Sequence, residues 1–221
     1  MSGPDAPLRL AITGTDTGVG KTLVSCALLA ALRARGIDAR AMKPVETGIT
    51  GRHAGTDGAR LHRAAGGAGD ADDVCPATYA EPLAPLVAAE RARRPLDVAR
   101  LDAAAARLEA GADALDFAGL AVRWALDVVV VAADRLGVLN HALLTVREAE
   151  RRGLRVRAVA LHPLQAGAAD PSAASNAAVL ARLLGAVPLV TVPYLDGVAQ
   201  EDPAALAAAG DALARVLLAP P

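Results

Sequence analysis

Nine residues near the start of the chain, Gly-Thr-Asp-Thr-Gly-Val-Gly-Lys-Thr at 14–22, have the types and spacing of a phosphate-binding loop. Glycines let backbone N–H groups turn toward a polyphosphate, and a helix that starts directly after them adds the positive end of its dipole. In such a loop the amine of Lys21 reaches the β- and γ-phosphates, and the hydroxyl of Thr22 ligates Mg²⁺. The stretch therefore predicts polyphosphate binding; the alternative is a glycine-rich turn without a ligand.

The loop departs from the usual pattern at two positions. The first glycine usually lies six residues before the lysine, where this chain has Thr15 and carries Gly14 one residue earlier. A related class of dimeric regulatory ATPases has a second, signature lysine five residues before the loop lysine, and this chain has Asp16 there. Asp16 argues against that class, which stays open as an alternative function.

Three further residues can contribute charge or oxygen ligands. Lys43 opens Lys-Pro-Val-Glu-Thr-Gly at 43–48 directly after a predicted strand, and the C-terminal edge of a parallel sheet is where ligands bind. Alone it would be a surface lysine, but together with a phosphate loop a second phosphate-facing cation is the better interpretation. Thr47 offers a hydroxyl in the same turn. Asp57 is either the N-cap of the helix that follows or a carboxylate for a metal ion.

Short apolar runs separated by helical patterns must position these residues. Strands are predicted at Leu8–Thr13, Ala39–Met42, Val128–Ala132, Val156–Leu161 and Val187–Val192. Helices are predicted at Lys21–Arg35, Pro85–Arg93, Asp97–Ala110, Leu115–Ala125, Leu139–Arg152, Ala174–Leu184 and Pro203–Leu217. Because strands that are apolar along their whole length are buried on both faces, we expect an α/β fold like that of P-loop NTPases. It is a three-layer sandwich with a mainly parallel sheet and helices on both faces.

Composition limits the functions that the chain can have. With 221 residues, it is long enough for a single domain spanning residues 1–221. A net charge of −1 and an aromatic share of 2% argue against nucleic-acid binding. Few cysteines fit a reducing compartment, and the polar start and short apolar runs predict neither a signal peptide nor a membrane span. We expect a cytoplasmic protein.

Four motifs resemble those of the dethiobiotin synthetase family and occur in the same order. They are the loop at 14–22, Lys-Pro-Val-Glu-Thr-Gly at 43–48, Ala-Glu-Pro-Leu-Ala-Pro at 80–85 and Leu-Gly-Val-Leu-Asn-His at 136–141. The resemblance implies a homodimeric ligase that makes dethiobiotin from 7,8-diaminopelargonic acid, CO₂ or bicarbonate, and ATP with Mg²⁺. A substrate amine becomes a carbamate, which attacks the γ-phosphate; the second amine then closes the ureido ring and expels phosphate. Such chemistry depends on positioning and charge neutralisation more than on a protein nucleophile.

The same resemblance implies roles for individual residues. The catalytic residues are Lys21, Lys43 and Thr17. The nucleotide contacts Gly18, Val19, Gly20, Lys21, Thr22, Leu23, Asp57, Pro193, Tyr194 and Leu195, and Mg²⁺ is held by Thr22 and Asp57. The substrate lies against Thr47, Gly137, Leu139 and Asn140, where a helix start accepts its carboxylate from the partner subunit. On the residues alone, Asn140 is an N-cap candidate.

One departure from the family concerns a central strand. The family has a strand ending in a Val-Glu-Gly-Ala-Gly-Gly type motif whose Glu binds Mg²⁺; it would fall between Asp113 and Ala114 and is absent from the sequence. In agreement, the patterns predict no confident strand between Lys43 and Asp127. Acidic residues nearby are either substitutes for the missing Glu or solvated charges at helix ends; they are Glu109, Asp113 and Asp116.

A second departure concerns the base. Where the family has an Asn-Asp pair that reads the adenine edge, this chain has Leu161 and His162, so base selectivity is open.

The missing strand fits a natural variant with weakened activity, a deletion in the gene model, or a chain that only binds. Three functions therefore remain: the ligase, a non-catalytic or weakened nucleotide-binding module, and a signature-lysine regulatory ATPase.

Overall fold

The structure is a computed structural model that describes residues 8–51, 55–67, 70–106, 117–167 and 170–219. The chain contains two compact units. The first comprises Met1–Val24, Asp113–Ala199 and Ala212–Pro221, and the second comprises Ser25–Ala112 and Gln200–Asp211. Two such units can together form one domain, so the single domain of residues 1–221 stays a prediction.

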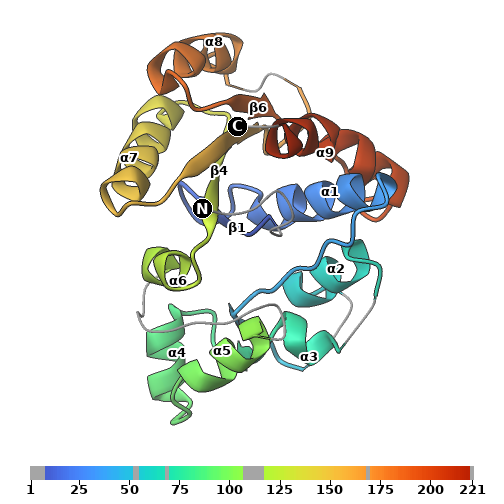
Figure 1. Cartoon of the computed structure of the whole chain (residues 1–221), viewed down its shortest axis with the longest axis vertical. Coiled ribbons are helices and arrows are strands. Elements are labelled where there is room, and N and C mark those ends of the chain that lie inside the picture. Colours follow the sequence, from blue (N-terminus) through green and yellow to red (C-terminus); the bar gives the residue numbers. More distant parts are fainter. Residues whose placement is uncertain (1–7, 52–54, 68–69, 107–116, 168–169, 220–221) are drawn as a thin grey trace. The chain divides into compact units, whose positions relative to one another are not determined.

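A four-stranded parallel sheet runs through the first unit (Figure 1). Its strands are β1 (Leu10–Gly14), β4 (Asp127–Ala133), β5 (Val156–His162) and β6 (Leu189–Thr191), in the order β1-β4-β5-β6. The register pairs Ile12 with Val129, and Ala133 with His162. The parallel α/β sheet predicted from the sequence is confirmed, and the loops that follow its strands emerge at one shared edge.

Both faces of the central strands are covered. Val129, Val130 and Val131 in β4 are 0% exposed, which explains why the strand is apolar at every position. On one face, β4 and β5 pack against α7 (Val138–Arg151) and α8 (Ala173–Leu184), seen beside the strands in Figure 1. The buried positions of α7 recur mostly at intervals of three and four residues, the spacing of a single helix face; they are Val138, Ala142, Val146 and Ala149.

One more described helix belongs to this unit and two cross its boundary. α6 (Phe117–Arg123) precedes β4. α1 (Lys21–Ala34) begins in the first unit and continues in the second, and α9 (Pro203–Leu218) ends in the first. The end of α9 is joined to β5, because Arg157 donates a hydrogen bond of 2.8 Å to the carbonyl of Leu217.

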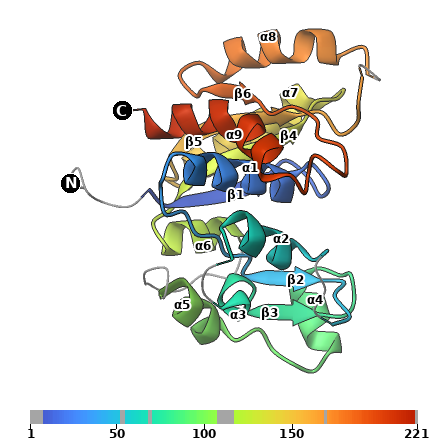
Figure 2. The same cartoon turned by 90° about the vertical axis from the view of Figure 1, so that its right-hand side faces the viewer.

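The second unit contains a small parallel sheet of β2 (Val45–Thr47) and β3 (Ala77–Tyr79), side by side in Figure 2. Its helices are α2 (Asp57–Ala64), α3 (Ala71–Val74), α4 (Pro85–Arg91) and α5 (Val98–Ala106). The hydroxyl of Tyr79, the last residue of β3, donates to the carbonyl of Arg94 at 3.1 Å. The guanidinium of Arg94 lies 4.7 Å from the centre of the Tyr79 ring, within the range of a cation–π contact.

Two predictions about the strands of this unit are wrong. Ala39–Met42 is not a strand, and the interval between Lys43 and Asp127 does contain strands, β2 and β3. A strand forms where a neighbour can pair with it, and β3 offers its partners only to the residues after Pro44. Lys43 therefore lies before β2 and not at the end of a strand.

The remaining predicted elements recur with shifted ends. α1, α4, α8 and α9 start within one residue of their predicted positions, and α7 starts one residue early at Val138. β6 is shorter than the predicted Val187–Val192. The predicted gap between Asp113 and Ala114, together with Glu109 and Asp116, lies outside the described residues. Among the described helices, none has the length and apolar character needed to cross a membrane.

Candidate active site

The phosphate loop between β1 and α1 has the backbone that its sequence predicts. The N–H of Thr15 donates to the carbonyl of Val131 in β4 at 3.0 Å, which fixes the start of the loop to the sheet. The carboxylate of Asp16 accepts the N–H of Thr17 at 2.7 Å. Gly18 and Gly20 have φ values of +73° and +95°, in the left-handed region that favours glycine. Positive φ at these two positions is the kind of backbone that lets successive amides of a loop turn toward an anion.

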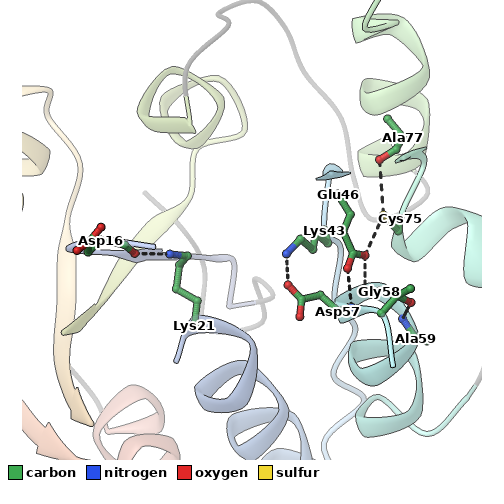
Figure 3. Close-up of polar contacts among 10 residues, drawn as sticks. Asp16, Lys21, Lys43, Glu46, Asp57, Gly58, Ala59, Cys75 and Ala77 are labelled. Carbon is green, nitrogen blue, oxygen red and sulfur yellow. Dashed lines mark hydrogen bonds and ion pairs between the residues drawn. The ribbon is translucent and has the colours of Figure 1, made fainter. Parts of the chain in front are cut away.

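Lys21, the first residue of α1, bends back over the loop. Its Nζ donates to the carbonyl oxygen of Asp16 at 2.7 Å (Figure 3). That partner is a neutral oxygen, whereas a phosphate oxygen is charged and forms the stronger hydrogen bond with an ammonium group. The observed position is therefore one from which the lysine can turn to a polyphosphate.

The loop glycines also permit close packing. A Cβ added to Gly14 would lie 2.8 Å from Cγ2 of Val19 and 3.0 Å from Cδ of Lys21. A Cβ added to Gly20 would lie 2.5 Å from Cδ2 of His162. Val19 is itself 1% exposed and belongs to the core. Gly14, Val19 and Gly20 are thus packed closely against neighbouring side chains, whereas Thr17 and Gly18 are exposed.

The loop after β4 lies against the phosphate loop through an ion pair. The guanidinium of Arg135 is 3.1 Å from the carboxylate of Asp16, and both side chains are about half exposed. Residues in and just before α8 also hold this second loop. The Leu136 N–H donates to Asp170 at 2.7 Å, and the Asn176 amide donates to Asp134 at 2.9 Å. The Leu136 hydrogen bond is the main reason why the pKa of Asp170 is lowered. Sequence reasoning had singled out Asp16 but not its partner Arg135, nor Asp134, Asp170 and Asn176.

The predicted substrate residues at 137–140 sit at the start of α7. Gly137 is the N-cap, with φ +93°, and Leu139 is half-buried while Asn140 is exposed. The N-cap interpretation of Asn140 is wrong, because Asn140 is the third residue of the helix. After β6, Pro193 and Tyr194 are exposed and Leu195 is half-buried.

A second cluster of charged groups lies in the second unit. Lys43 forms an ion pair with the carboxylate of Asp57, and the two side chains are 30% and 31% exposed (Figure 3). Asp57 is the first residue of α2, and the N-cap is Thr56, whose hydroxyl accepts the Ala59 N–H at 3.2 Å. The alternative role of Asp57 as an N-cap is therefore wrong.

The buried carboxylate of Glu46 holds the start of α2, which carries Asp57, and sequence reasoning missed this residue. Its carboxylate is buried and accepts the N–H groups of Asp57 at 2.7 Å and Gly58 at 3.1 Å. Two of the N–H groups that a helix start leaves without partners are thereby satisfied by a negative charge, which the helix dipole favours. β2 thus holds the first turn of α2, and with it Asp57 beside Lys43. Only the position of Glu46 inside the motif 43–48 could have marked it.

Cys75 completes the surroundings of Glu46. Its Sγ lies 3.8 Å from the Glu46 carboxylate. Burial, and then the nearby charge of Glu46, raise the pKa of this thiol to about 12. A raised pKa keeps the thiol protonated at neutral pH, in keeping with a donor to the Glu46 carboxylate.

The motif at 80–85 and the end of the motif at 43–48 are joined in the structure. The Gly48 N–H donates to the Glu81 carbonyl at 3.2 Å, and the Ile49 N–H donates to the Tyr79 carbonyl at 2.9 Å. Thr47, the predicted substrate hydroxyl, is half-buried at the end of β2. The structure therefore brings Lys43, Thr47 and Asp57 into one unit, and Lys21 and Thr22 into the other.

The donor set suits a hard cation. Thr22 and Asp57 offer oxygen, the ligand that Mg²⁺ prefers, and Mg²⁺ usually takes one or two protein ligands and completes its shell with phosphates and water. Within the described parts of the chain, no group of three or more His, Cys, Asp or Glu side chains could hold a metal ion. Such a set is sufficient only together with a bound triphosphate, so the metal role of both residues stays a prediction.

Comparisons with known proteins place the chain in a family. A family model described as an AAA domain matches residues 9–202. The chain is 42% identical over 209 residues to an ATP-dependent dethiobiotin synthetase of Anaeromyxobacter dehalogenans (strain 2CP-C), covering 86% of this chain and 92% of that protein. It is 36% identical over 219 residues to a protein of the same name from Aromatoleum aromaticum, covering 89% and 94%. A third, from Mycobacterium sp. (strain JLS), is 38% identical over 203 residues, covering 81% and 86%.

Proposed function

This chain belongs to the ATP-dependent dethiobiotin synthetase family, and we propose that it catalyses ureido-ring closure, the last step in making dethiobiotin. The substrates are 7,8-diaminopelargonic acid, CO₂ or bicarbonate, and ATP. The observation that carries the proposal is the phosphate loop, in which two left-handed glycines follow the half-buried strand β1 and lead into Lys21 at the start of α1. A triphosphate site of this kind is what an ATP-dependent ligase needs first.

The proposed reaction has three bond-forming steps. One amine nitrogen attacks CO₂, forms a C–N bond and loses a proton to give a carbamate. A carbamate oxygen attacks the γ-phosphorus, and the bond from that phosphorus to the bridging oxygen of ADP breaks. The second amine attacks the carbamoyl carbon, the C–O bond to phosphate breaks, and the ring closes with loss of a second proton. No residue of the protein needs to be covalently modified.

The residues of the loop neutralise and orient the triphosphate. The amides of residues 18–23 form the cradle, with Thr17 at its rim and the side chain of Lys21 turned from the Asp16 carbonyl to the β- and γ-phosphates. Lys43 stabilises the carbamate and the charge that develops during transfer. In the proposed mechanism Thr22 and Asp57 hold Mg²⁺, which when bound neutralises phosphate charge.

The substrate and base sides of the proposed site use residues that the resemblance implies. Thr47, Gly137, Leu139 and Asn140 contact the diaminopelargonic acid. Its carboxylate lies at the start of α7 of a second copy, where helix amides favour an anion. Pro193, Tyr194 and Leu195 border the base. We therefore also propose a homodimer, which sedimentation or light scattering would test, and a cytoplasmic location, in keeping with the few cysteines.

A single assay separates the three functions. The protein is mixed with Mg-ATP, bicarbonate and 7,8-diaminopelargonic acid, and dethiobiotin is sought by mass spectrometry while ADP is measured in parallel. Dethiobiotin formed in step with ADP supports the ligase. ATP binding without product would support a nucleotide-binding module, and ATP turnover that does not need the diamine would support a regulatory ATPase.

A further inference from the structure

His162 is a buried histidine for which the proposed reaction has no use. It ends β5, and its side chain is 3% exposed. Its Nδ1 lies 3.1 Å from the carbonyl oxygen of Val192. Because a carbonyl can only accept, Nδ1 carries the proton, and the neutral ring presents an unprotonated Nε2 on its other side.

The other side of this ring faces the phosphate loop. A Cβ added to Gly20 would lie 2.5 Å from Cδ2 and 3.2 Å from Nε2 of His162, so the imidazole occupies the space next to the Gly20 Cα. Gly20 has a φ of +95° and directly precedes Lys21. The orientation of the Gly20 peptide decides whether the amides at this end of the loop point to a phosphate. The ring therefore supports the loop where its conformation matters most.

The carbonyl bound by the ring belongs to a second nucleotide element. Val192 is 0% exposed, and its N–H donates to the Leu161 carbonyl at 2.9 Å. With the His162 bond, both polar backbone groups of Val192 are fixed by the end of β5. The exposed Pro193 and Tyr194, proposed to border the base, follow directly.

We propose that His162 is a positioning residue for the nucleotide: its ring fixes the phosphate loop at Gly20, and its Nδ1–H fixes the start of residues 193–195. The proposal rests on ATP binding at the phosphate loop and not on the diamine chemistry. In this proposal the buried His162 acts on the nucleotide through Gly20 and Val192 and does not itself contact the base.

Two variants separate the two contacts. His162→Phe keeps a ring next to Gly20 but has no donor for Val192. His162→Asn keeps an N–H close to the place of Nδ1 but loses most of the ring. Val159→Ala is the control for stability, because Val159 is equally buried in β5, packs in the core formed with α7 and α8, and lies on the opposite face of the strand from His162.

The measurement is the affinity of each full-length variant for Mg-ATP and for tripolyphosphate, which lacks base and ribose, by isothermal titration calorimetry, with thermal unfolding in parallel. We expect His162→Asn to weaken the binding of both ligands about tenfold, because the loop loses the ring that supports Gly20 and with it about one amide–phosphate hydrogen bond. His162→Phe should weaken ATP by a similar factor and leave tripolyphosphate within about twofold. Val159→Ala should lower the unfolding temperature without changing either affinity.

Two results would overturn the proposal: wild-type affinities in both His162 variants, or an affinity loss in Val159→Ala that matches theirs at equal loss of stability. A wild-type protein that binds neither ligand would overturn this proposal and the proposed function together. A protein that binds ATP through His162 as described, yet makes no dethiobiotin, would contradict the proposed function alone.

Discussion

Lys21 and Lys43 are the only lysines in a chain that otherwise uses arginine as its cation, and both stand in the motifs of the proposed site. An ammonium group is a compact charge with rotatable donors, suited to following a phosphoryl group as it moves. The two are held differently, since Lys21 rests on a neutral carbonyl and Lys43 on the carboxylate of Asp57. In the proposed mechanism, Lys43 becomes available only when another cation takes that carboxylate.

At this scale we expect Lys21→Ala to weaken ATP binding between about tenfold and a hundredfold, because charge-assisted hydrogen bonds to the phosphates are lost. Calorimetric titration with Mg-ATP measures the change. Arg33→Ala is the control, since it removes one positive charge from the last turn of the same helix. Unchanged ATP affinity in Lys21→Ala would show that the site lies elsewhere.

At the scale of elements, the attachment of α2 to β2 depends on one buried carboxylate. Glu46→Ala would leave the N–H groups of Asp57 and Gly58 without their acceptor. We expect the free energy of unfolding in urea to fall by about 1–3 kcal/mol. Glu201→Ala, which removes a glutamate of the same unit from an exposed ion pair with Arg63, should cost less than about 1 kcal/mol. Equal losses would mean that Glu46 is not a special anchor.

The turn into α1 provides a second test at this scale. Gly20 and Gly153 both have positive φ, +95° and +77°, but only at Gly20 would an added Cβ meet another side chain. Gly153→Ala should cost about 1 kcal/mol through the backbone alone. Gly20→Ala should cost more, and should also reduce ATP affinity, because the loop must shift away from His162. Similar unfolding curves for the two variants, with intact ATP binding in Gly20→Ala, would contradict the close packing of Gly20 against His162.

For the molecule as a whole, His162 predicts how stability changes with pH. Burial lowers the pKa of its ring below the ordinary value of 6.5. Below about pH 6.5 the unfolded chain therefore binds a proton that the folded chain does not, and the free energy of unfolding decreases as the pH falls from about 7 to 5. Glu148 and Asp170 have lowered pKa values too, but they start from 4.5 and 3.8 and act only at lower pH.

Urea unfolding of the wild type and of His162→Asn across that range tests this prediction. The wild type should lose stability as the solution becomes more acidic, and the variant should lose less. A variant with the same slope as the wild type would assign the pH dependence to other groups.

The sequence predicted those parts whose signal is local. The phosphate loop, β4, β5 and the helices around them follow from glycine spacing, apolar runs and helical periodicity. β2 and β3 could not be found in this way, because each has three residues and forms only by pairing with the other. The same limit applies to side chains: Glu46 acts on Asp57 and Gly58, and His162 on Val192, 30 residues later. Only the fold brings these partners together.

The order of the strands sets a size limit on one position of β4. His162 ends β5 and Gly20 follows β1, yet β4 lies between those two strands. The phosphate loop and His162 come together near the end of β4, where Thr15 is hydrogen-bonded to Val131 and the register partner of His162 is Ala133. Residues paired across a sheet project to the same face, so the methyl group of Ala133 and the ring of His162 lie on one face of the sheet. A valine or leucine at position 133 would compete with the imidazole for space on that face, which limits the size of the side chain that this position can carry.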